Sequence, residues 1–350
     1  MTTNAGIACR ARAECPECGG AGTAEYAGLR DRLFGAPGQW GMRSCRNCDL
    51  LWLDLIPENH EVGKLYARYY THSANAGAAS GAEVRGLKRK ILARAFGYPG
   101  GDGAGALKGA LASVLSQMQA FRDYAGGAVM WLPHSPGKKL LDLGCGSGEF
   151  PLRMRGLGWT VAGAETDPAA AKFAREKYGI DVRAGDVFNA GFAEKSFDAI
   201  TLSHVIEHVP DPRAAFAKIA SLLTPGGLVS VVTPNQHSLA HRCFGSAWRG
   251  LEVPRHFQVF SSASLGRAAK AAGLRVRELR TVARTARKIW WESRRLARAA
   301  RGGALDLGTF DEVPGGAEKL RGLLFQAAEE AGSRALGWGE EILLIAERAP

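Results

Sequence analysis

The sequence predicts an α/β protein with a doubly wound, mostly parallel sheet that follows a small cysteine-rich module. From Lys138 onward, short β-rich runs alternate with helical patterns, which is typical of βαβ units. Several of these runs are apolar on both faces, as expected of strands that helices cover on each side. Near the N-terminus, four of the seven cysteines fall into two C-x2-C pairs.

Seven β-rich runs account for the predicted sheet. They read KKLLDLG, TVAGAET, VRAGD, FDAITLSH, GLVSVVT, LRVRELRTV at 274–282 and EILLIAE at 341–347. The last two runs are expected to close the sheet, with a helical insertion between them at about 283–338. The predicted units are a cysteine-rich module at 9–56, a helical linker region at 57–135, and the α/β domain at 136–350.

Composition narrows the functional classes. With 46% hydrophobic and 23% charged residues, the chain has the balance of a globular protein. It has no run of about 18 apolar residues and no apolar signal core, so we expect a cytoplasmic protein. The net charge of +11 is local: twelve Lys/Arg between Arg267 and Arg301 face only two Glu, a balance of +10. The basicity therefore marks one surface rather than a general affinity for polyanions.

A glycine-rich turn, LLDLGCGSGEF at 140–150, is the strongest signal for a ligand. A strand ends near Asp142, and Gly144, Gly146 and Gly148 punctuate the turn into a helix. Glycine lets the backbone approach a ligand closely and adopt positive φ at little steric cost. The third glycine comes one residue earlier than in the dinucleotide pattern G-x-G-x-x-G. Close packing against a ligand, rather than pyrophosphate capture, is the expected use.

Acidic residues follow the next two strands. Glu165 lies 21 positions after Gly144, where a carboxylate can accept hydrogen bonds from both ribose hydroxyls. Asp186, followed by Val187, comes after the third strand, where a carboxylate can accept from an adenine amino group. Their shared position at the carboxyl ends of successive strands predicts a ligand crevice at a topological switch point.

These segments carry a family resemblance. The run LDLGCGSG…GAETDP…AGDV…FDAITLSHVIEHVPDP…LLTPGGLVSVVTPN resembles the class I S-adenosylmethionine-dependent methyltransferases over about 140–260. The resemblance implies a Rossmann-like sheet, S-adenosylmethionine as cofactor, and methyl transfer. It also implies that Asp142, the glycine turn, Glu165 and the Asp186–Val187 segment hold the cofactor, with Ser203 nearby. An ordinary strand–turn–helix corner and an NAD-dependent enzyme are the alternatives.

The segment HVIEHVPDP after the fourth strand offers the first candidates for chemistry. On a helical turn, His204, Glu207 and His208 share one face, so three ligands or bases can converge. The segment resembles the E-x-x-E-H element of ubiquinone-biosynthesis O-methyltransferases, which is associated with a divalent metal. Here His204 stands where that family has a glutamate. We therefore predict that His204 and His208 are catalytic candidates. A divalent metal bound near Glu207 is a further hypothesis. The alternative is that the Glu-His pair only shapes the cofactor pocket.

A second cluster follows the fifth strand, in a stretch predicted to be a substrate-recognition loop. TPNQHSLAHRCFGSAWRGLEVPRHFQVFS is dense in aromatic, basic and imidazole groups, as a loop that recognises a polar or anionic acceptor would be. It holds His237, His241, Trp248, Arg249, Glu252, Arg255 and His256. Its end looks like a P-x-H-x-x-x-F-S element of methyltransferases in sugar and natural-product pathways, which implies His256 as a base. The alternative is that His256 orders the loop.

The two cysteine pairs predict a structural zinc site. Cys15, Cys18, Cys45 and Cys48 form C-x2-C…C-x2-C with 26 residues between the pairs. Two pairs of thiolates complete a closed tetrahedral site, which has no open position for catalysis. Unliganded thiols or another cluster are the alternatives.

The segment 281–301 reads as a basic amphipathic helix. Its apolar residues can pack on the protein core, which is the plainest interpretation. Peripheral contact with an anionic membrane and RNA binding are the alternatives. The chain lacks an N-P-P-Y-type motif after the fourth strand, which disfavours nucleic acid as a substrate. The resemblance therefore predicts O-methylation of a small-molecule, sugar or glycan acceptor. An RNA methyltransferase and a non-catalytic binding protein with the same fold remain the competing hypotheses.

Overall fold

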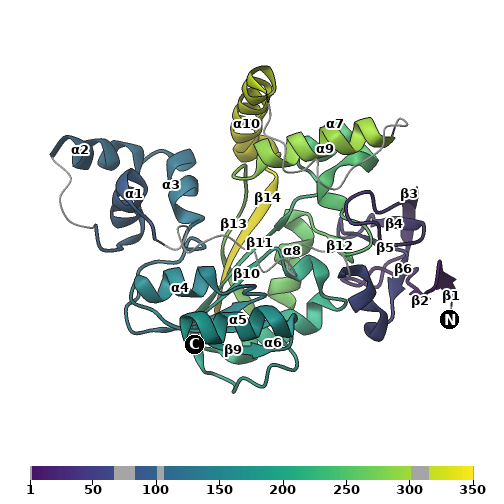
Figure 1. The fold of residues 1–350 in the computed structure, drawn as a ribbon, viewed down its shortest axis with the longest axis horizontal. Coiled ribbons are helices and arrows are strands. Elements are labelled where there is room, and N and C mark those ends of the chain that lie inside the picture. Colours follow the sequence, from purple (N-terminus) through teal and green to yellow (C-terminus); the bar gives the residue numbers. More distant parts are fainter. Residues whose placement is uncertain (1, 67–82, 101–105, 301–314, 350) are drawn as a thin grey trace.

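The computed structural model describes residues 2–66, 83–100, 106–300 and 315–349. Within these residues the strands form a central seven-stranded sheet and two small N-terminal sheets, which lie to one side of it (Figure 1). Parts of the predicted linker (67–82 and 101–105) and of the predicted insertion (301–314) fall outside the described residues.

The central sheet has the strand order β13-β14-β11-β10-β7-β8-β9. The pairs from β9 to β11 are parallel, whereas β14 runs antiparallel to both β11 and β13. The order reverses direction between β7 and β10, so a crevice is expected at their carboxyl ends. The predicted doubly wound, mostly parallel seven-stranded sheet is confirmed. The strands are β7 (Lys139–Leu143), β8 (Thr160–Glu165), β9 (Asp181–Ala184), β10 (Phe197–Ser203), β11 (Leu223–Pro234), β13 (Leu274–Val282) and β14 (Glu341–Arg348).

Helices cover both faces of this sheet because successive residues of a strand point to opposite sides. Leu140 packs in one cluster with Met154 of α4, whereas Leu141 packs in another with Phe216 of α6 and Leu265 of α8. The aspartates that begin α5 and α6 cap them, each followed by proline at the first helical position. The helices are α4 (Glu149–Gly156), α5 (Pro168–Tyr178), α6 (Pro212–Leu222) and α8 (Ser262–Ala271).

Three helices precede the sheet and lie beside α4, on the side away from the N-terminal sheets (Figure 1). Ile91 and Leu92 of α1 join the core cluster that contains Leu140 and Met154. These helices therefore extend the face of the sheet that α4 covers. They are α1 (Gly86–Phe96), α2 (Ala106–Leu115) and α3 (Gln119–Gly126).

The N-terminal module consists of two small antiparallel sheets. One joins β1 (Thr2–Asn4), β2 (Ile7–Ala11) and β6 (Leu55–Pro57). The other joins β3 (Gly22–Leu29), β4 (Trp40–Cys45) and β5 (Leu51–Leu53), and it is completed by β12 (Gln258–Val259). A 3-10 helix, Asn59–Tyr66, follows the module. The cysteine-rich segment therefore folds as a compact β module, as its zinc-ribbon-like pattern predicts.

The stretch after β11, predicted to be a loop, contains ordered elements. It forms α7 (Leu239–Phe244), 3-10 turns at Gly245–Ala247 and Arg249–Leu251, and β12. The side chain of Ser238 caps α7. β12 pairs with β5, so that Gln258 lies opposite Trp52 and Val259 opposite Leu51. The α/β domain and the module thus share a sheet.

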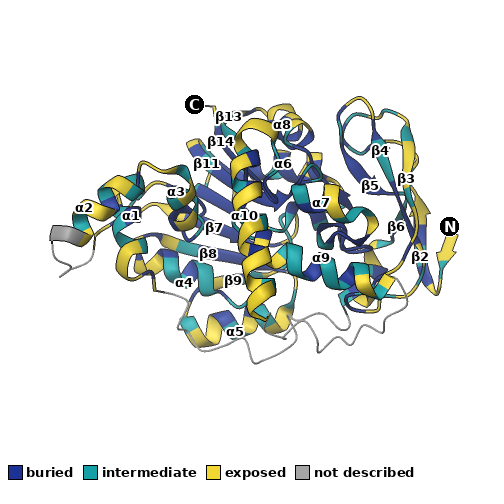
Figure 2. Ribbon diagram, turned by 90° about the horizontal axis from the view of Figure 1, so that it is seen from above, coloured by how far each residue is buried: buried dark blue, intermediate teal, exposed yellow. Residues whose placement is uncertain are grey.

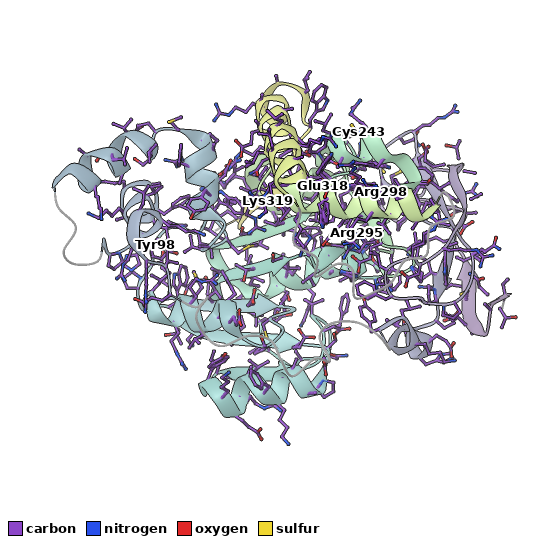
Figure 3. All side chains as sticks on the ribbon, turned by 45° about the horizontal axis from the view of Figure 1, so that its top comes forward. Tyr98, Cys243, Arg295, Arg298, Glu318 and Lys319 are labelled. Carbon is purple, nitrogen blue, oxygen red and sulfur yellow. The ribbon has the colours of Figure 1, made fainter. Side chains whose placement is uncertain are left out.

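Two helices, α9 (Ala286–Ala300) and α10 (Gly316–Leu336), lie between β13 and β14 in the chain. Arg298 of α9 approaches Glu318 of α10 at 3.7 Å (Figure 3). Arg294 approaches the same carboxylate at 3.4 Å. The apolar side of α9 is used inside the protein: Leu296 is buried and Ile289 packs on the core of the module. α10 crosses above the strands with an exposed outer face (Figure 2). Membrane contact through 281–301 stays a prediction.

None of the described helices combines the length and the apolarity that a membrane crossing requires.

Candidate functional site

The glycine turn joins β7 to α4 at the carboxyl edge of the sheet. Gly144 has a φ of +69°, and a Cβ there would lie 2.5 Å from Cγ2 of Val205. Any larger residue would therefore push the turn away from the segment that follows β10. A Cβ on Gly146 meets nothing within 4 Å, so the turn leaves open space at this point. Gly148 precedes α4 and packs closely on Ala174 of α5.

Glu165, at the end of β8, ties this turn to the neighbouring loops. One carboxylate oxygen accepts a hydrogen bond from the Gly146 N–H (2.8 Å) and the other from the Asp167 N–H (2.9 Å). The Glu165 carbonyl accepts from the N–H of Gly185. Asp186, half-buried, accepts backbone hydrogen bonds within its own turn, and Val187 lies beside it. The side chains expected to meet a ribose and an adenine therefore follow adjacent strands.

Asp142 and Ser203 complete the predicted cofactor set. Asp142 is buried and accepts a hydrogen bond from Oγ1 of Thr201 at 2.6 Å. Burial raises the pKa of Asp142 to about 7. Ser203 is exposed at the end of β10, one residue beyond the β10–β7 pairing. All eight residues predicted to hold the cofactor thus lie at the carboxyl ends of β7, β8, β9 and β10 or in the turns that follow.

His204 lies between two buried carboxylates. Its Nε2 is 2.8 Å from Oε1 of Glu341, and its Nδ1 is 3.4 Å from Oε1 of Glu207. Nε2 can donate to Glu341, and a ring protonated on both nitrogens also places its positive charge beside Glu207. Burial alone would lower the pKa of His204, but the interactions with Glu207 and Glu341 raise it to about 10. His204 is therefore an imidazolium at neutral pH and cannot accept a proton.

The predicted helical face is only partly realised. The 3-10 turn comprises Ile206–His208, and His204 precedes it with a φ of +56°. Glu207 reaches His204 on one side, while His208 turns toward His256, with ring centroids 4.7 Å apart. Glu207, His208 and His256 each place a ligand atom within 4.8 Å of the others. The three side chains that converge are thus those of Glu207, His208 and His256. His204 contacts the Glu207 carboxylate but does not belong to this group.

The two histidines of this group differ in their surroundings. His208 is half-buried, and its Nδ1 lies 3.0 Å from the Arg255 carbonyl and 3.1 Å from the Tyr66 hydroxyl. A carbonyl only accepts, so this nitrogen carries the proton and Nε2 keeps its lone pair. His256 is 4% exposed, and its Nδ1 donates to the Gly250 carbonyl at 2.8 Å. Burial lowers the pKa of His256 to about 4. His256 is neutral but enclosed, whereas His208 is only half-buried.

Arg255 anchors the backbone that orients His208. Its guanidinium is fully buried and reaches both carboxylate oxygens of Asp31, at 2.7 and 3.1 Å. It also donates to Glu252 at 3.1 Å and lies 4.4 Å over the ring of Phe34. Asp31 belongs to the N-terminal module, so this bidentate pair joins the module to the loop that carries His256.

The four predicted zinc ligands gather in one cluster. Sγ of Cys15 lies 3.4 Å from Sγ of Cys48, and Cys18 lies 3.4 Å from Cys45. All four sulfurs fall within 4.8 Å of one another. A tetrahedral zinc with bonds of about 2.3 Å holds its sulfurs roughly 3.8 Å apart. The donor set and its spacing therefore fit a four-thiolate zinc site.

The cluster also touches the loop after β11. His237 Nε2 lies 2.6 Å from a carboxylate oxygen of Asp49, the residue that follows Cys48. Gln236 donates to the Asp49 carbonyl. His241 stacks on Trp248, with centroids 4.5 Å apart, and contacts the Tyr26 hydroxyl at 2.8 Å. The predicted recognition loop is thus built against the cysteine module.

Sequence reasoning missed the partners that set the charge of this site. Glu341 approaches His204 from β14, Arg284 pairs with Glu341 from the start of the insertion, and Asp31 approaches Arg255 from the module. Their separation along the chain, 137 residues for Glu341 and 224 for Asp31, leaves no local signal.

Comparison with known proteins agrees with this arrangement. A family model described as a methyltransferase domain matches residues 115–279. The ubiquinone biosynthesis O-methyltransferase of Thiobacillus denitrificans is 35% identical over 157 residues, which are 41% of this chain and 67% of that protein. The Pseudomonas entomophila protein of the same name is 31% identical over 155 residues, covering 41% of this chain and 67% of the relative.

Solved structures that resemble the chain include a Haloferax volcanii methyltransferase in complex with the Trm112 activator. It is 19% identical, with a TM-score of 0.46 over 66% of this chain and 93% of that one. The [4+2]-cyclase SpnF is 19% identical, with a TM-score of 0.44 over 75% of this chain and 93% of its own. The match to the curated relatives and the seven-stranded sheet lead to one assignment. The chain belongs to the class I S-adenosylmethionine-dependent methyltransferases.

Proposed function

We propose that this enzyme methylates a hydroxyl oxygen of a small-molecule acceptor and that His208 is the general base. The observation that carries the proposal is the orientation of His208, whose Nδ1 is fixed by the Arg255 carbonyl, so that the neutral ring carries its lone pair on Nε2. The match to proteins named ubiquinone biosynthesis O-methyltransferases supports oxygen as the methyl-accepting atom.

The cofactor site follows from the residues around the glycine turn. Gly146 gives open space, Glu165 would accept hydrogen bonds from the ribose hydroxyls, and Asp186 would accept one from the adenine amino group. When bound, S-adenosylmethionine supplies an electrophilic methyl carbon on a sulfonium. The acceptor oxygen forms its bond to that carbon as the carbon–sulfur bond breaks, and the electron pair stays on sulfur. His208 Nε2 takes the hydroxyl proton.

The remaining charged groups position this chemistry. Protonated His204, held by Glu207 and Glu341, fixes the segment between β10 and the 3-10 turn. Positioning matters most in such an in-line displacement, because a correctly oriented pair of reactants saves several kcal/mol of entropy.

The same donor set fits a divalent cation. Glu207, His208 and His256 would hold it through one oxygen and two imidazole nitrogens, a set that leaves open positions. Such an ion would acidify a bound acceptor hydroxyl. His208 would act either as a base or as a ligand of this ion. Measuring activity after chelation and stepwise return of zinc and magnesium distinguishes the two roles, because a base keeps working without the ion at this site.

Four cysteines of the module are proposed to hold one structural zinc. Cys15, Cys18, Cys45 and Cys48 meet the spacing of a four-thiolate site and leave no position for substrate.

Glu165→Ala tests the cofactor site. The variant loses charge-assisted hydrogen bonds to the ribose and also the tie to the Gly146 N–H. Each such bond is worth about 1.5–3 kcal/mol, so we expect S-adenosylmethionine to bind about 10- to 150-fold more weakly by calorimetric titration. Glu176→Ala, an exposed carboxylate on α5, is the matched control and should bind normally. A folded wild-type protein that does not bind the cofactor contradicts the proposal.

His208→Gln tests the base. We expect kcat to fall by about 100-fold with S-adenosylmethionine affinity unchanged, measured as S-adenosylhomocysteine release with phenols, sugars and sugar phosphates as acceptors. The deficit should shrink at high pH, because hydroxide can replace the lost base. His60→Gln, an exposed histidine, is the control. An unchanged pH profile in His208→Gln would argue that the residue is structural.

A further inference from the structure

The structure contains a cavity that is rich in positive charge. Its volume is about 640 Å³, and its walls come from α1, α3, α4, α9, α10 and the segment before α1. This is the size range of small-molecule sites in proteins. Six of the lining residues are basic and one, Glu83, is acidic; the basic residues are Arg85, Lys88, Arg153, Arg284, Arg287 and Lys288.

Part of this charge is compensated within the protein. Arg284 pairs with Glu341 at 3.1 Å, Arg85 with Glu83 at 2.6 Å, and Lys288 approaches Glu292 at 3.8 Å. In the part of the chain that the structure describes, neither Lys88 nor Arg287 forms an ion pair with a carboxylate. The cavity therefore carries a surplus of positive charge.

Two separate helices supply this surplus. Lys88 comes from α1 and Arg287 from α9. Burial, together with the charges of Arg153 and Arg284, lowers the pKa of Lys88. Like charges brought together from separate elements repel one another, and a bound anion relieves that repulsion. Basic residues that only face solvent can lie along one helix, and they need not be brought together from several elements.

Arg284 connects the cavity to the proposed catalytic residues. Its guanidinium pairs with Glu341, whose Oε1 lies 2.8 Å from His204 Nε2. Gly127 makes room for it, because a Cβ at that position would lie 2.8 Å from Cδ of Arg284. A molecule in the cavity would thus contact Arg284, which two successive ion pairs, Arg284–Glu341 and Glu341–His204, connect to the segment that follows β10.

We infer that this cavity binds a phosphate-ester group of the methyl acceptor. The inference rests on the proposed function and specifies its substrate class: a hydroxyl compound that carries a phosphate or diphosphate. Lys and Arg side chains bind phosphate oxygens through charge-assisted hydrogen bonds. Surplus cations from two helices match a group with two or more negative charges better than a single carboxylate.

Titration with inorganic pyrophosphate at low salt tests the site. We expect wild-type protein to bind it, and Lys88→Gln and Arg287→Gln each to weaken binding by about tenfold or more. Lys88→Arg should restore it. Lys319→Gln is the matched control, because Lys319 is exposed on α10 next to Glu318 and outside the cavity (Figure 3). Its affinity should equal that of the wild type.

The S-adenosylmethionine titration, run on the same samples, separates two failures. Protein that binds the cofactor but not pyrophosphate overturns this inference and leaves the proposed function intact. Equal weakening by Lys319→Gln and Lys88→Gln also overturns it, since binding would then be nonspecific. Protein that binds pyrophosphate but not the cofactor supports the site and contradicts the proposed function.

A vesicle experiment identifies the source of the phosphate. Vesicles of phosphatidylcholine with one fifth phosphatidic acid are sedimented with wild type and Lys88→Gln. Pyrophosphate binding without co-sedimentation supports the site and assigns a soluble phosphate ester. Co-sedimentation that pyrophosphate competes away and that Lys88→Gln loses supports the same site with a lipid-linked phosphate.

Discussion

A Cys45→Ser variant should lose its bound zinc and much of its thermal stability. Four thiolates that converge within 4.8 Å are stabilised as a cluster only when a cation compensates them. Structural zinc contributes about 10–16 kcal/mol in small zinc domains, so its loss exceeds what a module of this size can tolerate. The effect should spread to the methyltransferase domain, because Cys15, Cys45, Cys48 and Trp52 belong to the same core cluster as residues of α6 and α8.

The measurement is zinc content by mass spectrometry together with the melting temperature. Wild type should carry about one zinc per chain, and Cys45→Ser should carry none and melt more than about 10 °C lower. Cys243→Ser is the control, since this exposed cysteine lies outside the cluster. Wild-type protein that is folded and free of metal would refute the zinc site.

Arg255→Ala should destabilise the protein by about 3–5 kcal/mol, because removing one partner of a buried ion pair leaves the other charge uncompensated. Asp31 and Glu252 would both remain buried next to the deleted guanidinium. Arg255→Lys should recover only part of the loss, since an ammonium cannot reproduce the two-pronged contact with Asp31.

Urea unfolding measures this effect. Arg242→Ala, an exposed arginine on α7, should stay within about 0.5 kcal/mol of wild type. A loss below about 1 kcal/mol for Arg255→Ala would mean that water, rather than the arginine, compensates Asp31. The variant should also slow methyl transfer. The Arg255 side chain anchors the backbone segment whose carbonyl orients His208, so losing the side chain frees that segment.

The central sheet could be predicted from the sequence because its signals are local. The strands in the middle of the sheet are short apolar runs, and helices with clear caps separate the parallel strands, as at Asp167 and Asp211. The glycine turn and Glu165 could be predicted for the same reason, since their spacing follows directly from one βαβ unit. The assignments of individual residues to cofactor binding, and the domain boundaries at 9–56 and 57–135, stay predictions.

The partners of the catalytic candidates could not be predicted, because they come from distant parts of the chain. The sequence pattern makes His204 look like one more ligand on a helical turn, yet its φ of +56° and its contact with Glu341 make it a half-buried cation. The stretch after β11 lacks a strong periodic pattern and reads as a loop. Its strand, β12, exists only because β5 offers a free edge. Short elements of this kind depend on tertiary contacts, not on local propensity.

The strand shared between β5 and β12 has a consequence for how the protein is made. β5 ends at Leu53, and its partner begins at Gln258, about 200 residues later in the chain. At roughly 5–20 residues per second, a ribosome needs about 10–40 s to supply that partner. During this interval one edge of β5 in the nascent N-terminal sheet is unpaired, and an unpaired edge strand can pair with the wrong segment. Metal capture by the cysteines, all translated before β5, would hold the nascent module in register until its last strand emerges.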